Sequence, residues 1–255
     1  MEATTDACPY EIWECIFKLI NGDNRTLEAL SVVSKQFLYI INHVRCVVTI
    51  SEQTIPFIPR LFQRFPHLTS LNLSLTSQEV DLDALLCQIS TFSLDIKSLY
   101  ISNPNYDIPE HGLRALSKKM KNLTSLTCST MGFLRKDDIF LIADCFPLLE
   151  ELNLTWVKND CETLVKGDDD EDYRGHLLAL PKLRKINLHG TVLDQQSVNY
   201  LCQNCELLQE VNVITCPLMT HPVTEIDETV TKLQLKYRTY IVEYDTEDVI
   251  CRFPS

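Results

Sequence analysis

Two short segments contain residue types that bind metal ions or carry out redox chemistry. Cys202 and Cys205 have the spacing of half a zinc site or of a dithiol redox pair. No second CxxC and no His pair follows at metal-binding spacing, so we favour buried structural thiols, with a metal or thiol enzyme as the alternative. The acidic run from Asp168 to Asp172 lacks the alternating ligands and central glycine of an EF-hand loop. We interpret this run as a solvated insert.

Other catalytic patterns are not apparent in the sequence. The six histidines are scattered and define no triad, and the six glycines form no phosphate-binding loop. We therefore expect no catalytic residue, no metal and no cofactor. The chain is not expected to be an enzyme in the ordinary sense.

The composition narrows the classes of partner and compartment. The formal net charge of -12 argues against nucleic acid, which is bound by clustered Lys and Arg. The acidic start lacks the layout of a secretory signal, and no apolar run approaches the roughly 18 residues of a membrane span. We expect a protein of the cytoplasm or nucleus that binds no membrane. Its eleven cysteines are then predicted to be buried thiols, such as Cys15, Cys87 and Cys128.

One phrase recurs along most of the chain: apolar, two polar, apolar, polar, apolar. It occurs six times, as LTSLNL, IKSLYI, LTSLTC, LEELNL, LRKINL and LQEVNV. The spacings between the middle apolar residues are 28, 27, 26, 34 and 25. A period of this kind indicates a repeat architecture. The long interval contains the acidic run, which we interpret as a loop inserted into one repeat.

Each phrase alternates as a short strand does, with its apolar side chains on one face. Segments with helical spacing separate the phrases, at residues 82–89, 111–120, 137–146 and 196–205. In the second segment Leu113, Leu116 and Met120 should face inward. We predict an α/β fold in which strand–helix units stack into a parallel sheet backed by helices. A strand at 46–50 should begin the sheet, and residues after about 217 should close it.

Repeats of this length, entered through FP or LP and sometimes preceded by Cys, resemble the cysteine-containing leucine-rich-repeat family. The residues that carry this resemblance are Phe65-Pro66, Cys145-Phe146-Pro147, Leu180-Pro181 and Cys205. The resemblance implies a short α/β solenoid, shaped like an arc of the ribonuclease-inhibitor horseshoe.

The first forty residues have a different pattern, typical of two or three short helices. The first helix is predicted to carry one apolar stripe, formed by Trp13, Ile16, Phe17 and Ile20. Thr26 and Ser34 are predicted to cap the helices that follow. Because so short a segment makes only a small core, apolar surface should remain exposed for a partner or for the neighbouring repeats.

This N-terminal pattern resembles the F-box, whose signature is Leu-Pro-x-Glu, an apolar helix, and then Val-(Cys/Ser)-Lys-x-(Phe/Trp). The direct matches are Pro9, Glu11, Ile12, Ile16, Leu30, Val33, Ser34, Lys35 and Phe37. Cys8 stands where the family usually has Leu, and VVSKQF is particularly like plant F-box proteins with leucine-rich repeats. We therefore predict an all-α F-box over residues 1–43. A leucine-rich-repeat domain should follow over 44–255, with a C-terminal cap from about 217.

The resemblance implies a substrate-recognition adaptor of an SCF (Skp–cullin–F-box) E3 ubiquitin ligase. The F-box would dock on a Skp-family adaptor, and through it on a cullin, while the repeats hold a protein for ubiquitination and degradation. The residues implied to contact the Skp adaptor are Pro9, Ile12, Trp13, Ile16, Phe17, Leu30, Val33, Ser34, Lys35 and Phe37. Other subunits would transfer the ubiquitin, and this chain would supply proximity. The alternative is a leucine-rich-repeat interaction scaffold without a ligase role.

The residues that flank each apolar pair should project from the sheet face opposite the helices. Those that we predict to contact the target protein are Asn72, Tyr100, Glu151, Asn153, Lys185, Asn187, His189, Glu210 and Asn212. Asn occupies the central position in four of the six phrases, which predicts a ladder of amides. Two alternatives stay open: these side chains are merely solvated, or the rim loops, including the acidic insert, make the contacts.

Overall fold

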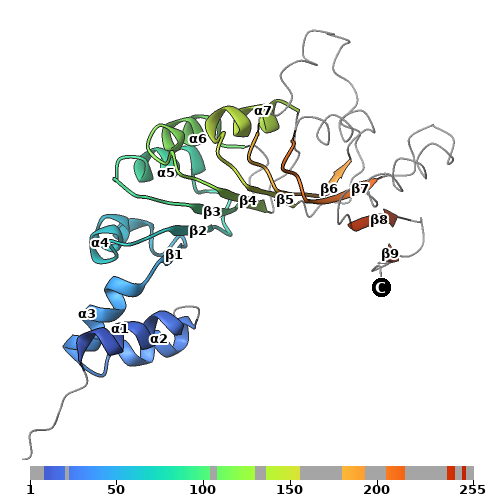
Figure 1. The fold of residues 1–255 in the computed structure, drawn as a ribbon. Helices are drawn as coiled ribbons and strands as arrows, with labels where there is room; N and C mark the ends of the chain where they lie inside the picture. Colours follow the sequence, from blue (N-terminus) through green and yellow to red (C-terminus); the bar gives the residue numbers. More distant parts are fainter. Residues whose placement is uncertain are drawn as a thin grey trace, which may run out of the picture.

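The computed structural model describes residues 9–20, 23–103, 108–129, 136–155, 180–192, 205–215, 240–244 and 249–250. Within these ranges the chain is an α/β protein with a parallel sheet and several helices (Figure 1). Most of the helix predicted at 196–205, all of the acidic run and most of the segment after 217 lie outside them. No helix in the described ranges is both long and apolar enough to cross a membrane.

The described strands form one nine-stranded sheet in which spatial order follows chain order. The strands are β1 (Val47–Ile50), β2 (Ser70–Ser74), β3 (Ser98–Ser102), β4 (Ser125–Ser129), β5 (Glu151–Thr155), β6 (Lys185–Val192), β7 (Glu210–Thr215), β8 (Tyr240–Tyr244) and β9 (Val249–Ile250). Strands β1 to β8 run parallel, and β9 is antiparallel to β8. Parallel neighbours need a crossover connection, so the spacing of the phrases sets the chain length between adjacent strands.

Each of the six repeated phrases forms a strand, and successive strands pair in matching register. The middle apolar residues lie side by side across the sheet, in the order Leu71, Leu99, Leu126, Leu152, Ile186 and Val211. The strand predicted at 46–50 is β1, whose Val48 pairs with Leu71. Strand β8 falls in the segment predicted to close the sheet and pairs with β7. The strand positions predicted from the phrase are therefore confirmed.

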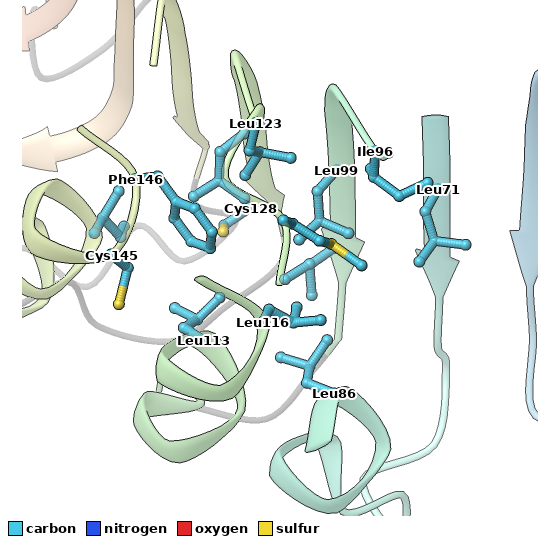
Figure 2. Packing of buried hydrophobic residues seen from close by; sticks show 14 of the residues in the cluster. Leu71, Leu86, Ile96, Leu99, Leu113, Leu116, Leu123, Cys128, Cys145 and Phe146 are labelled. Carbon is cyan, nitrogen blue, oxygen red and sulfur yellow. The ribbon is translucent and has the colours of Figure 1, made fainter. Parts of the chain in front are cut away.

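Helices between the strands lie on one face of the sheet (Figure 1). They are the short 3-10 helix η1 (Ile55–Phe57) and the α-helices α4 (Ile58–Arg64), α5 (Leu82–Ile89), α6 (Glu110–Ser117) and α7 (Lys136–Cys145). Leu71 and Leu99 of the sheet point toward Leu86, Leu113 and Leu116 of the helices (Figure 2). All five side chains are at most 1% exposed. Burial of a leucine side chain stabilises a fold by about 1.5–3 kcal/mol, so this layer supplies much of the driving force.

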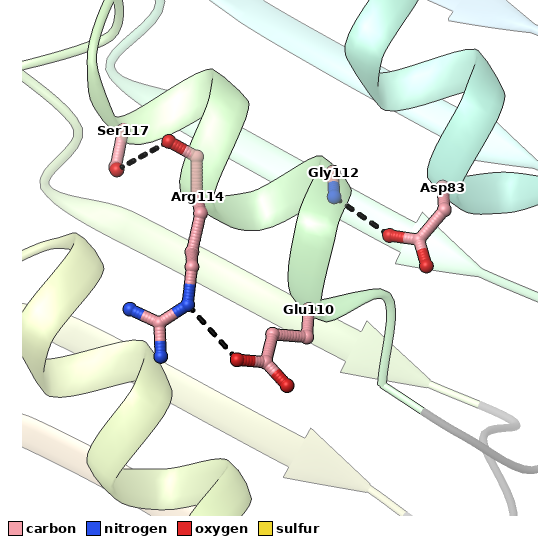
Figure 3. Close-up of polar contacts among 5 residues, drawn as sticks. All are labelled: Asp83, Glu110, Gly112, Arg114 and Ser117. Carbon is pink, nitrogen blue, oxygen red and sulfur yellow. Dashed lines mark hydrogen bonds and ion pairs between the residues drawn. The ribbon is translucent and has the colours of Figure 1, made fainter.

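Gly112 allows α6 to approach α5 closely (Figure 3). Its backbone N–H donates to Oδ1 of Asp83 at 2.6 Å. The first N–H groups of a helix have no partner within the helix, so a carboxylate from the neighbouring helix serves as an external cap. Nearby, Arg114 Nε lies 3.0 Å from Glu110 Oε1 in an exposed ion pair on the same helix. Asp83 therefore fixes where α6 begins relative to α5.

The N-terminal helices have an apolar cluster of their own. They are α1 (Tyr10–Leu19), α2 (Asn24–Ser31) and α3 (Lys35–Val44). The buried members of the cluster are Phe17, Leu27, Ile40, Ile41 and Val44. The ring of Phe37 lies 4.7 Å from that of Trp13 and 5.0 Å, edge-on, from that of Phe17, measured between centroids. The predicted boundary between residues 43 and 44 falls one residue before α3 ends.

Caps fix the starts of α2 and α3. Ser34 caps α3 as predicted, because its Oγ accepts from the backbone N–H of Phe37 at 3.1 Å. The prediction that Thr26 caps α2 is wrong. The helix begins at Asn24, and the carboxylate of Asp23 accepts from the backbone N–H of Thr26 at 3.1 Å and from its hydroxyl at 2.6 Å. A carboxylate also interacts favourably with the helix dipole, which explains why Asp23 is preferred over Thr26.

Only Arg45 and Cys46 separate α3 from β1, and side chains reinforce this junction. Asn42 Oδ1 accepts from Arg64 Nε on α4 at 2.9 Å. The guanidinium carbons of Arg45 and Arg64 lie 5.4 and 5.1 Å from the ring centroid of Phe65, within cation–π range. Both cations also lie at helix C-termini, where positive charge is favourable. The N-terminal helices are thus joined to the sheet by contacts as well as by the backbone.

Candidate interaction surfaces

Helix α1 has apolar side chains on its solvent-facing side. Ile12, Ile16 and Leu19 are 49%, 39% and 87% exposed. Their spacing of four and then three residues places them on one helix face, and we call them the outer stripe. Phe17 on the inner side is 1% exposed. A helix that is apolar on both sides is suited to burial on both sides, and here only the inner side is buried.

The turn between α2 and α3 adds further exposed apolar side chains. Val32 and Val33 are 83% and 65% exposed. Ser34 fixes the backbone that follows through its cap, and Lys35 begins α3 with an exposed side chain. In the described part of the N-terminal helices, the exposed large aliphatic side chains thus form two sets, the outer stripe and this turn.

The residues predicted to contact a Skp adaptor differ in burial. Pro9, Ile12, Ile16, Val33, Ser34 and Lys35 are exposed, Trp13, Leu30 and Phe37 are partly buried, and Phe17 is buried. The last four pack in the helical cluster and support the surface from beneath. Ile16 does not share the inner side of α1 with Trp13, Phe17 and Ile20, as predicted. It lies on the outer side with Ile12, so the predicted single stripe is wrong at this residue. Leu19 was not predicted to lie on the outer side of α1, although its spacing from Ile12 and Ile16 places it there.

The sheet face opposite the helices is lined by polar side chains, as predicted. On β2, Leu71 and Leu73 are buried while Asn72 between them is partly exposed. The same alternation occurs on β3 and β4. We call this side of the sheet the polar face. Because alternate strand residues point to opposite sides, the buried leucines determine which residues the polar face presents.

The residues predicted to contact the target lie on the strands of this face. Asn72, Tyr100, Asn153, Asn187 and Glu210 are partly exposed, and Glu151 and Lys185 are exposed. His189 and Asn212 lie on β6 and β7, but their side chains lie outside the described part of the structure. The predicted amide ladder is interrupted, because Tyr100 and Thr127 follow Asn72 across the sheet. Consecutive Asn positions occur only across β5, β6 and β7.

Charged residues on the polar face of β5, β6 and β7 pair with one another. The register places Lys185 between Glu151 and Glu210. Its Nζ lies 3.9 Å from Oε1 of Glu151 and 3.5 Å from Oε2 of Glu210. Ser125 Oγ lies 3.5 Å from the other oxygen of Glu151, at the edge of this cluster. All three charged side chains are roughly half exposed, so each pair stabilises the sheet by only about 0–1 kcal/mol.

Tyr100 on β3 is held in place by the neighbouring strand. Its phenolic oxygen accepts a hydrogen bond from Ser129 Oγ on β4 at 2.8 Å. The ring is partly exposed, and the residue beside it in the register is Thr127. Tyr100 is therefore a large side chain with a fixed orientation among small ones.

A carboxylate at one edge of the sheet binds backbone N–H groups. Glu52 follows β1 and accepts from the N–H groups of Thr76 and Ser77, which follow β2. The hydroxyl of Thr76 donates to the same oxygen at 3.1 Å. These hydrogen bonds, that from the Thr76 N–H first, lower the pKa of Glu52 to about 2. The carboxylate of Glu52 therefore fixes the backbone that follows β2.

The described cysteines differ in exposure. Cys128 on β4 is buried as predicted, and burial raises the pKa of its thiol to about 12. The prediction is wrong for Cys15, which is exposed because it lies on the outward side of α1, and Cys87 is only partly buried. Cys205 is 1% exposed, and Cys202 lies outside the described ranges. Among the residues that the structure describes, no group of three or more His, Cys, Asp or Glu could hold a metal ion.

In comparison with known families, no family model matches this chain.

Proposed function

We propose that the chain is a substrate-recruiting adaptor of an SCF-type ubiquitin ligase. In this proposal α1 to α3 form an F-box that docks on a Skp-family adaptor. The strand–helix units form a leucine-rich-repeat solenoid that holds the target protein. The chain brings the target close to subunits that carry out ubiquitin transfer, and it has no chemistry of its own.

The observation that carries the proposal is the outer stripe. Exposed apolar patches on a folded protein mark interaction sites more often than isolated exposed residues do. Ile12, Ile16 and Leu19 share one helix face although the inner face of α1 already has its own buried core. Burying an isoleucine or leucine side chain yields about 1.5–3 kcal/mol, so a partner that covers the stripe gains a substantial part of its binding energy there.

The arrangement of the sheet supports the second half of the proposal. Parallel strands in chain order, at near-regular spacing and with helices on one face, are expected of leucine-rich repeats. Among the described residues the helices lie on one face of the sheet, and no described helix covers the other face. That polar face is then available to a target protein.

Co-expression of the intact chain with a Skp-family adaptor tests the docking half. We expect a stable complex that survives gel filtration. The double variant Ile12→Glu and Ile16→Glu should abolish it, because each charge would be desolvated against an apolar partner surface. Both residues are exposed, so the variant should fold, whereas a charge at the buried Phe17 would unfold the helices.

A control is Phe57→Glu, which places one such charge on an apolar side chain that is 50% exposed but lies outside α1 to α3. The control should keep the complex. Failure of the intact chain to bind the adaptor would refute the proposal. A complex that resists the Ile12/Ile16 change would favour an interaction scaffold without a ligase role.

A further inference from the structure

The polar face is divided into an uncharged half and a charged half. From β1 to β4 its central row presents Thr49, Asn72, Tyr100 and Thr127. On β2, β3 and β4 a serine flanks the central residue on each side. None of the positions that β1 to β4 present on this face is Asp, Glu, Lys or Arg. In a chain of net charge -12 this is a distinct chemical environment.

Three carboxylates that border this half or lie beyond it have partners within the protein. Glu151 and Glu210 share Lys185 on the far half of the face. Glu52, at the edge of β1, is engaged by the backbone after β2. The β1 to β4 positions of this face contain no charged side chain, so a charged group brought onto them would lose water without gaining an opposite charge from them, which is unfavourable. Hydroxyl and amide side chains, in contrast, offer both donors and acceptors to an uncharged partner.

Tyr100 supplies an anchor for such a partner. Tyrosine is among the residues that contribute most binding energy at protein interfaces, since it buries a large area with few rotatable bonds. The bond from Ser129 fixes its ring before any partner arrives, which lowers the entropy lost on binding. Its neighbours on the polar face of β2 and β4 are Ser, Thr and Asn, so they leave space around it.

We propose that the polar face of β1 to β4 is the seat for an uncharged, extended segment of the target protein, with Tyr100 as its anchor. This rests on the target-binding role proposed above and specifies the class of segment. Strands lie about 4.8 Å apart and an extended residue spans about 3.4 Å, so roughly four or five residues cross this half. The ion-paired side chains of β5 to β7 lie outside the seat.

The test uses the full chain, immobilised, and a phage library of random peptides of about seven residues. The enriched peptides should contain about threefold fewer Asp, Glu, Lys and Arg residues than the unselected library. Tyr100→Ala should reduce retention of the enriched pool about tenfold, the effect of losing an interface anchor. Thr127→Asp, which puts a charge beside Tyr100, should reduce it by a similar factor.

The matched control is Asn187→Asp, which adds the same charge in the central row but on β6. It should change retention by less than about twofold, as expected of a surface charge away from the interface. Enrichment of Lys- and Arg-rich peptides, which the overall negative charge alone would select, would overturn the proposal. So would equal losses in the two Asp variants, no loss with Tyr100→Ala, or no enrichment over an uncoated surface.

The outcome is separable from that of the docking experiment. The Ile12→Glu and Ile16→Glu variant should select the same uncharged peptides as the intact chain, because its changes lie on α1. Loss of adaptor binding with peptide selection intact would refute only the ligase role. Adaptor binding without peptide selection would refute only the seat.

Discussion

Replacing Gly112 with alanine should destabilise the protein, although alanine is the better helix former. A Cβ at this position would lie 2.6 Å from Cβ of Leu86 and 2.9 Å from its Cδ1. The first of these atoms is bonded directly to the backbone of α5, so it can move only if the helix moves. Any separation of α5 from α6 also lengthens the 2.6 Å bond from the Gly112 N–H to Asp83.

Two opposing effects decide the sign. Changing Gly to Ala within a helix gains about 1 kcal/mol in helix propensity. Adding a methyl group to a closely packed site costs about 1–3 kcal/mol, and weakening a backbone hydrogen bond costs roughly 1 kcal/mol more. The packing and hydrogen-bond terms exceed the propensity term, so we expect Gly112→Ala to lower the free energy of unfolding by about 1–3 kcal/mol.

Urea denaturation followed by circular dichroism measures this change. The control is His111→Ala, the preceding residue in α6, whose side chain is exposed and whose loss should alter stability by less than about 0.5 kcal/mol. A Gly112→Ala variant as stable as the wild type, or more stable, would refute the close approach of the two helices. A changed denaturant slope would instead indicate altered compactness of the native or denatured state.

Two further predictions concern acid stability and thiol reactivity. Because the Thr76 and Ser77 N–H groups lower the pKa of Glu52 from 4.5 to about 2, this carboxylate contributes stability above pH 4.5 that is lost as the pH falls toward 2. Glu52→Gln should flatten that part of the pH dependence in urea titrations, and an unchanged profile would contradict the assignment. Alkylation of the folded protein followed by mass spectrometry should modify Cys15 and spare Cys128, since a thiol of pKa about 12 holds almost no thiolate at neutral pH. Equal modification of the two would show that Cys128 is not buried.

Features encoded by local patterns are predictable from the sequence. The alternation of apolar and polar residues predicts the strands, because the whole pattern lies within each phrase. Helical spacing in the same way predicts that Leu113, Leu116 and Met120 face inward, and all three are at most 2% exposed. The cap at Ser34 is likewise a local event, involving residues three positions apart.

Features that depend on how elements approach one another are not predictable in this way. Lys185 contacts Glu151 and Glu210 only because the register of the sheet aligns three residues that are far apart in the sequence. Nothing in the sequence around Gly112 indicates that its N–H meets a carboxylate of the preceding helix. The burial of Cys15 is predicted wrongly for a related reason. Its apolar neighbours suggest burial, but α1 has apolar side chains on both of its sides and only one of these sides is covered.

The order of the strands has a consequence for how the protein loses structure. Each described strand pairs only with the strand before it and the strand after it in the chain. The stability of such a sheet is close to a sum of couplings between neighbours, so no single pairing closes the whole structure. A terminal strand can detach while the rest keep all of their own pairings. Unfolding can therefore proceed stepwise from an end, and the intermediates differ chiefly in length.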